Sequence, residues 1–282
     1  MGRLAANRHA TAEYDIYCCR VNSMEVSPHL AYDTESTEAE ARRLWKAFDR
    51  PNGMIKIPAT REGLPAIQAL TREGINVNAT LIFSRERMRD VWEQFVSGLE
   101  IRQGCNESVD HIASVASFFV SRIDTKVDAW LANDPGLSGI QGEAAIALAR
   151  LCHADQQCWL TGDRWQRLAA AGAHHQRQLW ASMSVKNPAY SDINYVEALI
   201  GPGTVSTLPL DTLAAYRDHG QPALRLNQGL DRAAATVETL EAHGLHLEAV
   251  ANQLEQEGVQ KFVDAYDRLL NAIEQQLAPP KR

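Results

Sequence analysis

Short apolar segments alternate with longer amphipathic segments along this chain. Turn-forming residues bound most of the apolar segments, which is typical of buried strands, and the segments between them repeat apolar residues at helical spacing. Six strands are predicted, at residues 20–26, 54–60, 75–83, 112–121, 178–183 and 203–207. Helices are predicted at residues 33–48, 61–73, 84–98, 125–151 with a loop near 133–139, 163–171, 194–199, and from 210 onward with breaks at 220–222 and 244. Strands that alternate with helices favour an α/β fold with parallel pairing and right-handed crossovers.

The second predicted strand contains a lysine, Lys56, in an otherwise apolar run. Burying an ammonium group is costly unless the group is paired or loses its proton. A buried lysine that loses its proton becomes a nucleophile, which can form a Schiff base with a carbonyl compound. A second interpretation stays open, in which the aliphatic stem packs in the core and the head group reaches water.

Two neighbouring strands also carry polar side chains in their interiors. Glu25 lies within the first predicted strand, so a carboxylate there parallels the lysine in the next strand. In the third predicted strand, the two-residue alternation places four residues on one face: Asn76, Asn78, Thr80 and Ile82. Amide and hydroxyl groups on an inward face are unusual for a packed centre, so this pattern predicts a lined pocket.

Composition narrows the partners and the location that the chain is expected to have. The chain has 282 residues, a formal net charge of −7 and no cluster of basic residues, so no nucleic-acid partner is expected. No apolar run is long enough to span a bilayer and the start lacks a signal-peptide pattern, so no membrane partner is expected. The five cysteines lack metal-ligand spacing, which predicts reduced thiols in the cytoplasm and no metal site.

Catalytic groups of an α/β barrel lie at the carboxyl ends of its strands. Here those ends carry a carboxylate, an amine, amide and hydroxyl groups, and two cations: Glu25, Lys56, Asn78, Thr80, Ser117, Arg122, Ser184 and Lys186. An amine that condenses with a ketone, a carboxylate that moves protons and cations that hold a phosphate suit carbonyl chemistry on a phosphorylated sugar. Simpler explanations exist for single residues, because Glu25 could be a solvated acid, Arg122 could pair with Asp124, and Lys186 could be a surface residue. Their joint placement on successive strand ends favours the catalytic interpretation.

Several segments resemble the signature of the transaldolase family. Residues 55–60 read IKIPAT, Gly63 follows, and residues 74–84 read GINVNATLIFS. Residues 25–26 (EV), 117–122 (SFFVSR) and 184–190 (SVKNPAY) are also similar to that family, and residues 195–205 (YVEALIGPGTV) resemble its bacterial branch. The resemblance extends from about residue 21 to about residue 275.

The resemblance implies a TIM (β/α)8-type barrel and a Schiff-base reaction without a metal or another cofactor. The family transfers a dihydroxyacetone unit between sedoheptulose 7-phosphate and glyceraldehyde 3-phosphate in the pentose phosphate pathway. Carried over by motif position, its roles fall on Lys56 as the Schiff-base lysine, Glu25 and Thr80 as holders of the catalytic water, Asn78 and Ser117 as ligands of substrate hydroxyls, and Arg122, Ser184 and Lys186 as the phosphate site. Lys186 stands where the better-known branch has an arginine.

One departure from the family concerns the start of the chain. Transaldolases carry two more strand–helix units ahead of the unit that begins near residue 21, and the first of these supplies an acid/base aspartate. We therefore expect a divergent or replaced segment at residues 1–20, followed at residues 21–282 by an incomplete barrel domain with six strands. Two free parallel edges would invite association into a homo-oligomer, and loss of one acid/base group typically lowers a rate by about 10²–10⁴. Two alternatives stay open: a class I sugar-phosphate aldolase, or a catalytically impaired or inactive truncated chain.

Overall fold

Six parallel strands form one sheet in the computed structural model, which describes residues 22–277. The strands lie side by side in chain order, and each pairs in parallel with the next. They are β1 (Asn22–Glu25), β2 (Gly53–Pro58), β3 (Val77–Ile82), β4 (Ser114–Phe119), β5 (Arg177–Ala181) and β6 (Thr204–Ser206). The α/β prediction and its six strands are confirmed, in agreement with a barrel-type fold that is incomplete over these residues. The predicted segment at 1–20 lies outside the described residues.

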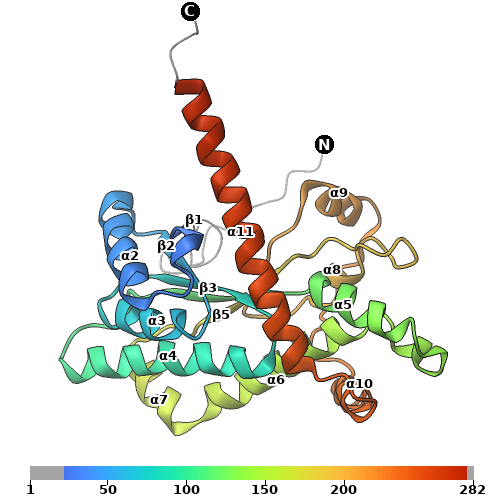
Figure 1. The fold of residues 1–282 in the computed structure, drawn as a ribbon. Helices are drawn as coiled ribbons and strands as arrows, with labels where there is room; N and C mark the ends of the chain where they lie inside the picture. Colours follow the sequence, from blue (N-terminus) through green and yellow to red (C-terminus); the bar gives the residue numbers. More distant parts are fainter. Residues whose placement is uncertain (1–21, 278–282) are drawn as a thin grey trace, which may run out of the picture.

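Helices follow the strands and cover the sheet (Figure 1). Two begin at caps that the sequence marks, because Asp33 accepts a hydrogen bond from the Ser36 N–H and Ser84 accepts one from the Arg87 N–H. None of the helices in the described range is long and apolar enough to cross a membrane. The helical elements are η1 (Pro28–Leu30), α2 (Thr34–Phe48), α3 (Gly63–Arg72), α4 (Arg85–Gly104), α5 (Ser121–Leu131), η2 (Pro135–Ile140), α6 (Ala144–Thr161), α7 (Asp163–Ala170), α8 (Asn194–Ala198), α9 (Leu210–His219), α10 (Leu230–Ala242) and α11 (Leu247–Leu277).

Three predicted boundaries are wrong. The helical region expected to end at residue 151 continues as α6 to Thr161. Helix α4 continues to Gly104, whereas Gly98 was expected to end it. A Cβ atom at Gly98 would lie 2.7 Å from the Gln68 carbonyl oxygen, so this glycine permits close packing of α4 on α3. Strand β4 ends at Phe119, and Ser121 already begins α5.

The two faces of the sheet differ in what they contact. Ile55, Ile57, Val77 and Ala79 are fully buried in the main core, and they alternate with the polar positions of β2 and β3. In Figure 1, α3, α4 and α6 lie along one side of the sheet, while α11 crosses in front of it and extends its last turns beyond the other elements. The second face is therefore the one that is left to form a site.

Strand β3 contains an irregularity that changes which residues share a face. Leu81 has a φ of +61°, and the register with β4 shifts between Ala79 and Ile82. Asn78 and Thr80 line a cavity, but Ile82 does not. Asn76 also lies outside the cavity, because its side chain donates to the Gly53 carbonyl at 3.0 Å and accepts from the Ala113 N–H at 2.8 Å. The predicted four-residue face is thus correct for two of its members.

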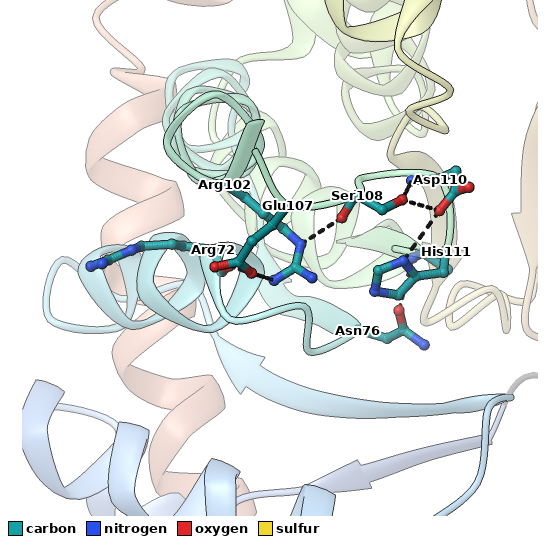
Figure 2. Close-up of polar contacts among 8 residues, drawn as sticks. Arg72, Asn76, Arg102, Glu107, Ser108, Asp110 and His111 are labelled. Atoms are coloured by element: carbon teal, nitrogen blue, oxygen red, sulfur yellow. Dashed lines mark hydrogen bonds and ion pairs between the residues drawn. The ribbon is translucent and has the colours of Figure 1, made fainter. Parts of the chain in front are cut away.

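A polar network fixes the connection between α4 and β4 at the amino end of that strand (Figure 2). Arg102 donates to the carbonyls of Ser108 and Arg72 and pairs with Glu107 at 2.6 Å. Asp110 accepts from the Ser108 hydroxyl and contacts the His111 ring. This network braces the sheet at the end opposite to the carboxyl ends of the strands, so we assign it a structural role.

Candidate functional site at the carboxyl ends of the strands

A cavity of about 410 Å³ lies on the inner face of the sheet. It is lined by residues of β1 to β5, by Val205 of β6, and by Thr207, which follows β6. Five of the eight predicted site residues line it: Glu25, Lys56, Asn78, Thr80 and Ser117. The strand register accounts for their proximity, because Glu25 pairs with Lys56 and Lys56 pairs with Asn78 across the sheet. Side chains that share a row of adjacent parallel strands point to the same face.

Lys56 and Glu25 form the charged centre of the cavity. Their Nζ and Oε1 atoms are 3.5 Å apart, and the side chains are 22% and 30% exposed. Burial raises the pKa of Glu25 above its usual value of 4.5, and the Lys56 charge opposes this rise. The ring of Phe262, on α11, lies 5.1 Å from Nζ, so an aromatic face covers one side of the amine.

A hydrogen-bonded chain orders the amide and hydroxyl groups beside the lysine. Ser117 Oγ donates to Asn78 Oδ1 at 2.8 Å, and Asn78 Nδ2 donates to Ser23 Oγ at 3.0 Å. Ser117 of the adjacent strand β4 and Ser23 of β1, which lies beyond β2, thereby hold the Asn78 amide in one orientation. The Thr80 hydroxyl is buried on the same cavity and has no hydrogen-bond partner among the described residues. A buried hydroxyl of this kind is suited to bind a water molecule or a substrate oxygen.

Arg122 lies in the first turn of α5 and does not line the cavity. Its guanidinium stacks on the Phe119 ring at 5.2 Å, and its Nη1 atom is buried without a hydrogen-bond partner in the described range. Burial lowers the pKa of this guanidinium, and Glu257 opposes the shift. The alternative pairing with Asp124 is wrong, because Asp124 instead accepts the Ala145 N–H at 2.7 Å. An unpaired, half-buried guanidinium is well suited to bind an anion.

Ser184 and Lys186 lie in the loop after β5, also outside the cavity. Lys186 Nζ donates to Ser184 Oγ at 2.7 Å. The ends of β4 and β5 are joined where Ser121 contacts Ser182 through a backbone bond of 3.0 Å and a hydroxyl contact of 2.9 Å. This junction sets the start of α5 beside the Ser184 loop, so the three predicted phosphate ligands occupy neighbouring strand ends.

The structure adds site residues that the sequence interpretation missed. Phe262 carried no local signal, because its contact with Lys56 depends on α11 crossing the carboxyl ends of the strands. Ser23 could have been found, since it shares the inward face of β1 with Glu25. Within residues 22–277, no group of three or more His, Cys, Asp or Glu side chains is placed to hold a metal ion.

The fold and the site define an α/β barrel-type protein whose pocket, at the carboxyl ends of parallel strands, is built around a lysine. A family model described as Transaldolase/Fructose-6-phosphate aldolase matches residues 16–273. This match covers most of the chain. The chain belongs to the transaldolase/fructose-6-phosphate aldolase family.

Relatives named Transaldolase are similar over nearly the whole chain. The protein of Saccharopolyspora erythraea is 48% identical over 262 residues, which are 92% of this chain and 71% of the relative. The protein of Thermobifida fusca is 50% identical over 91% of this chain and 70% of its own length. That of Parafrankia sp. is 47% identical over 90% and 70%, respectively.

Proposed function

We propose that this chain is a transaldolase, which transfers a dihydroxyacetone unit between sugar phosphates in the pentose phosphate pathway. Two kinds of finding support the proposal. Relatives at 47–50% identity carry that name, and the cavity brings an amine and a carboxylate within 3.5 Å of each other. That amine–carboxylate pair is the observation that carries the proposal, because Schiff-base chemistry needs a nucleophilic amine with a proton acceptor beside it.

In the proposed reaction, the Lys56 amine attacks the ketone carbon of the donor sugar and forms a carbinolamine. Glu25 supplies a proton, water leaves, and an iminium ion remains. The bond between the α and β carbons, counted from the former ketone carbon, then breaks. Its electrons form the enamine double bond and neutralise the iminium, and the hydroxyl proton on the β carbon passes to a base as that carbon leaves as the aldehyde. Glu25 is the only carboxylate that lines the cavity in the described part of the chain, so we assign it this base role as well. The acceptor aldehyde adds by the reverse steps.

Three cavity residues would support these steps. Thr80 would hold the water together with Glu25, since its hydroxyl is buried without a partner among the described residues. Asn78 and Ser117 would bind substrate hydroxyls, because their linked side chains are already oriented toward the cavity. Arg122, Ser184 and Lys186 would hold the phosphate away from the reacting carbon, where charge-assisted bonds position the substrate without taking part in the chemistry.

Borohydride trapping tests this proposal directly. The protein is incubated with fructose 6-phosphate, reduced, digested and analysed by mass spectrometry, and we expect a sugar adduct on Lys56. The Lys56→Ala variant should show no adduct and no turnover, whereas Lys46→Ala, a surface lysine on α2, should react as the wild type does. A folded wild-type chain without an adduct would support the alternative of an inactive chain, and unchanged turnover in Lys56→Ala would remove the Schiff-base mechanism.

The aldolase alternative is separated by omitting the acceptor. An aldolase releases glyceraldehyde 3-phosphate from fructose 6-phosphate over many turnovers, whereas a transaldolase stalls after one until an acceptor aldehyde arrives. We expect the second behaviour, because the relatives of this chain are named Transaldolase.

Association and location form the last part of the proposal. We assign the chain to the cytoplasm and to a homo-oligomer in which a second copy packs on α11. Four large apolar side chains are exposed on the last turns of that helix, and their spacing places them along one side of it: Leu269, Leu270, Ile273 and Leu277. Helices with apolar residues at such spacing pair with one another.

A further inference from the structure

The loop that carries Ser184 and Lys186 is anchored to a distant part of the chain at Tyr190. The Tyr190 hydroxyl donates a hydrogen bond of 2.8 Å to Oδ2 of Asp128. Asp128 lies on α5, the helix whose first turn holds Arg122. One contact therefore connects the two elements that supply the predicted phosphate ligands.

Asp128 is itself held in place by its second oxygen. Oδ1 of Asp128 accepts the Gly142 N–H at 2.9 Å. Gly142 has a φ of +72°, and a Cβ atom there would lie 2.8 Å from ring carbons of Tyr190. Both the hydroxyl and the ring of Tyr190 thus have fixed contacts. A side chain at position 142 would clash with the ring.

A second tyrosine joins the same helix one turn earlier. Tyr195 is 2% exposed and lies beside Asp124, which is 1% exposed and bound to the Ala145 N–H. The nearby Asp124 carboxyl adds to the burial that raises the pKa of the Tyr195 hydroxyl. Since Asp124 and Asp128 are four residues apart, they lie on one face of α5, where Asp128 faces Tyr190 of the loop and Asp124 faces Tyr195 of α8.

The loop is compact between Lys186 and its anchor. The Ala189 N–H donates to Asn187 Oδ1 at 3.0 Å, and the Tyr190 N–H donates to the Asn187 carbonyl at 3.1 Å. These bonds form a turn. Because Lys186 lies only four residues before Tyr190, a displacement of Tyr190 would also move Lys186. The anchor is thereby coupled to the cation of the loop.

We infer that Tyr190 is a positioning residue for anion binding. Through Asp128 it holds the 184–190 loop so that Ser184 and Lys186 stand beside Arg122 and bind the phosphate of the substrate. The inference rests on the proposed function, and it assigns Tyr190 no contact with the reacting atoms.

The test compares Tyr190→Phe, which removes only the hydroxyl, with Tyr216→Phe, whose hydroxyl makes no hydrogen bond in the described range. We expect the KM for fructose 6-phosphate to rise about three- to tenfold in Tyr190→Phe with kcat within twofold of wild type, because a bond to a charged group is lost. Borohydride trapping with dihydroxyacetone, which has no phosphate, should be unchanged. Tyr216→Phe should match wild type in both assays.

A double-mutant cycle with Lys186→Ala tests whether Tyr190 acts through the loop. If it does, adding Tyr190→Phe to Lys186→Ala should raise the KM little further. An unchanged KM in Tyr190→Phe, fully additive effects, or an equal loss of dihydroxyacetone trapping would overturn the inference. Asp128→Asn serves as the second variant, and it should reproduce the KM effect if Tyr190→Phe does not fold.

Failure of the proposed function would look different. A wild-type chain with neither turnover nor an adduct refutes the function, and calorimetric binding of inorganic phosphate then decides the inference. Weaker phosphate binding in Tyr190→Phe than in wild type and Tyr216→Phe supports it. Equal binding in all three proteins, or none in the wild type, overturns it.

Discussion

Asp124 makes the stability of this protein depend on pH. Its carboxyl group is 1% exposed, and burial is the main reason that its pKa rises from 3.8 to about 7. The negative charges of Asp128 and Glu143 add to the rise, while the Ala145 N–H and the Tyr195 hydroxyl oppose it. The folded chain therefore binds this proton more tightly than the unfolded chain does.

The sign of the effect follows from that difference. The contribution of Asp124 to the free energy of unfolding is fully present below the unfolded pKa and is lost as the pH rises through the folded pKa. The interval between 3.8 and about 7 corresponds to roughly 4 kcal/mol in total. Roughly 3 kcal/mol of this is lost between pH 5 and pH 8 according to the same linkage relation.

Urea unfolding followed by tryptophan fluorescence measures this quantity. Asp124→Asn has nearly the same shape and does not titrate, so its free energy of unfolding should fall by roughly 3 kcal/mol less than that of the wild type between pH 5 and pH 8. Asp211→Asn, which alters an exposed carboxylate on α9, should follow the wild type. Parallel pH dependences of Asp124→Asn and wild type would refute the argument.

Three further predictions concern the Glu25 carboxylate, the contact of position 142 with the Tyr190 ring, and the exposed apolar side of α11. Glu25→Gln should lower kcat by about 10²–10⁴ and remove the acid limb of the pH–rate profile, which lies above pH 4.5 because burial raises the pKa of Glu25; an unaltered limb contradicts the assignment. Gly142→Ala should lower the free energy of unfolding in urea by about 1–3 kcal/mol, because a side chain at that positive φ meets the Tyr190 ring; a stability equal to wild type contradicts this. If the proposed homo-oligomer forms through α11, changing Leu269 and Ile273 together to Glu should give monomers in light scattering, and a mass equal to that of the wild-type oligomer rules out α11 as the interface.

The parallel pairing of the strands could be predicted because apolar segments, such as residues 54–60 and 112–121, alternate with helical stretches long enough to form crossovers. The errors arose where one residue type serves two purposes. Glycine often ends a helix, but Gly98 lies within α4, where the absence of a side chain lets α4 pack closely on α3. The bulge at Leu81 is a left-handed conformation of an ordinary apolar residue, which no composition rule indicates.

The candidate site divides along similar lines. Strand alternation was enough to place Glu25, Lys56, Asn78 and Thr80 together, because neighbouring parallel strands bring the same face of each strand to one cavity. The contacts of Phe262 and Tyr190 depend on α11 and on a loop that returns to α5, and such long-range contacts leave no pattern in a single segment. Residues that shape a site through packing were therefore the ones that sequence reasoning missed.

The geometry around Lys56 offers a physical reason for the position of Glu25. In the proposed mechanism the Lys56 nitrogen needs a free electron pair to attack a carbonyl, and Glu25, 3.5 Å away, would take up the proton that this nitrogen gives up. Burial raises the pKa of Glu25, so this carboxylate accepts a proton more readily than an exposed glutamate would. Proton transfer also removes two opposite charges from a partly buried cavity, which reduces the desolvation that opposes it. The burial that makes a lysine in a strand costly thus also prepares its neighbour to take the proton.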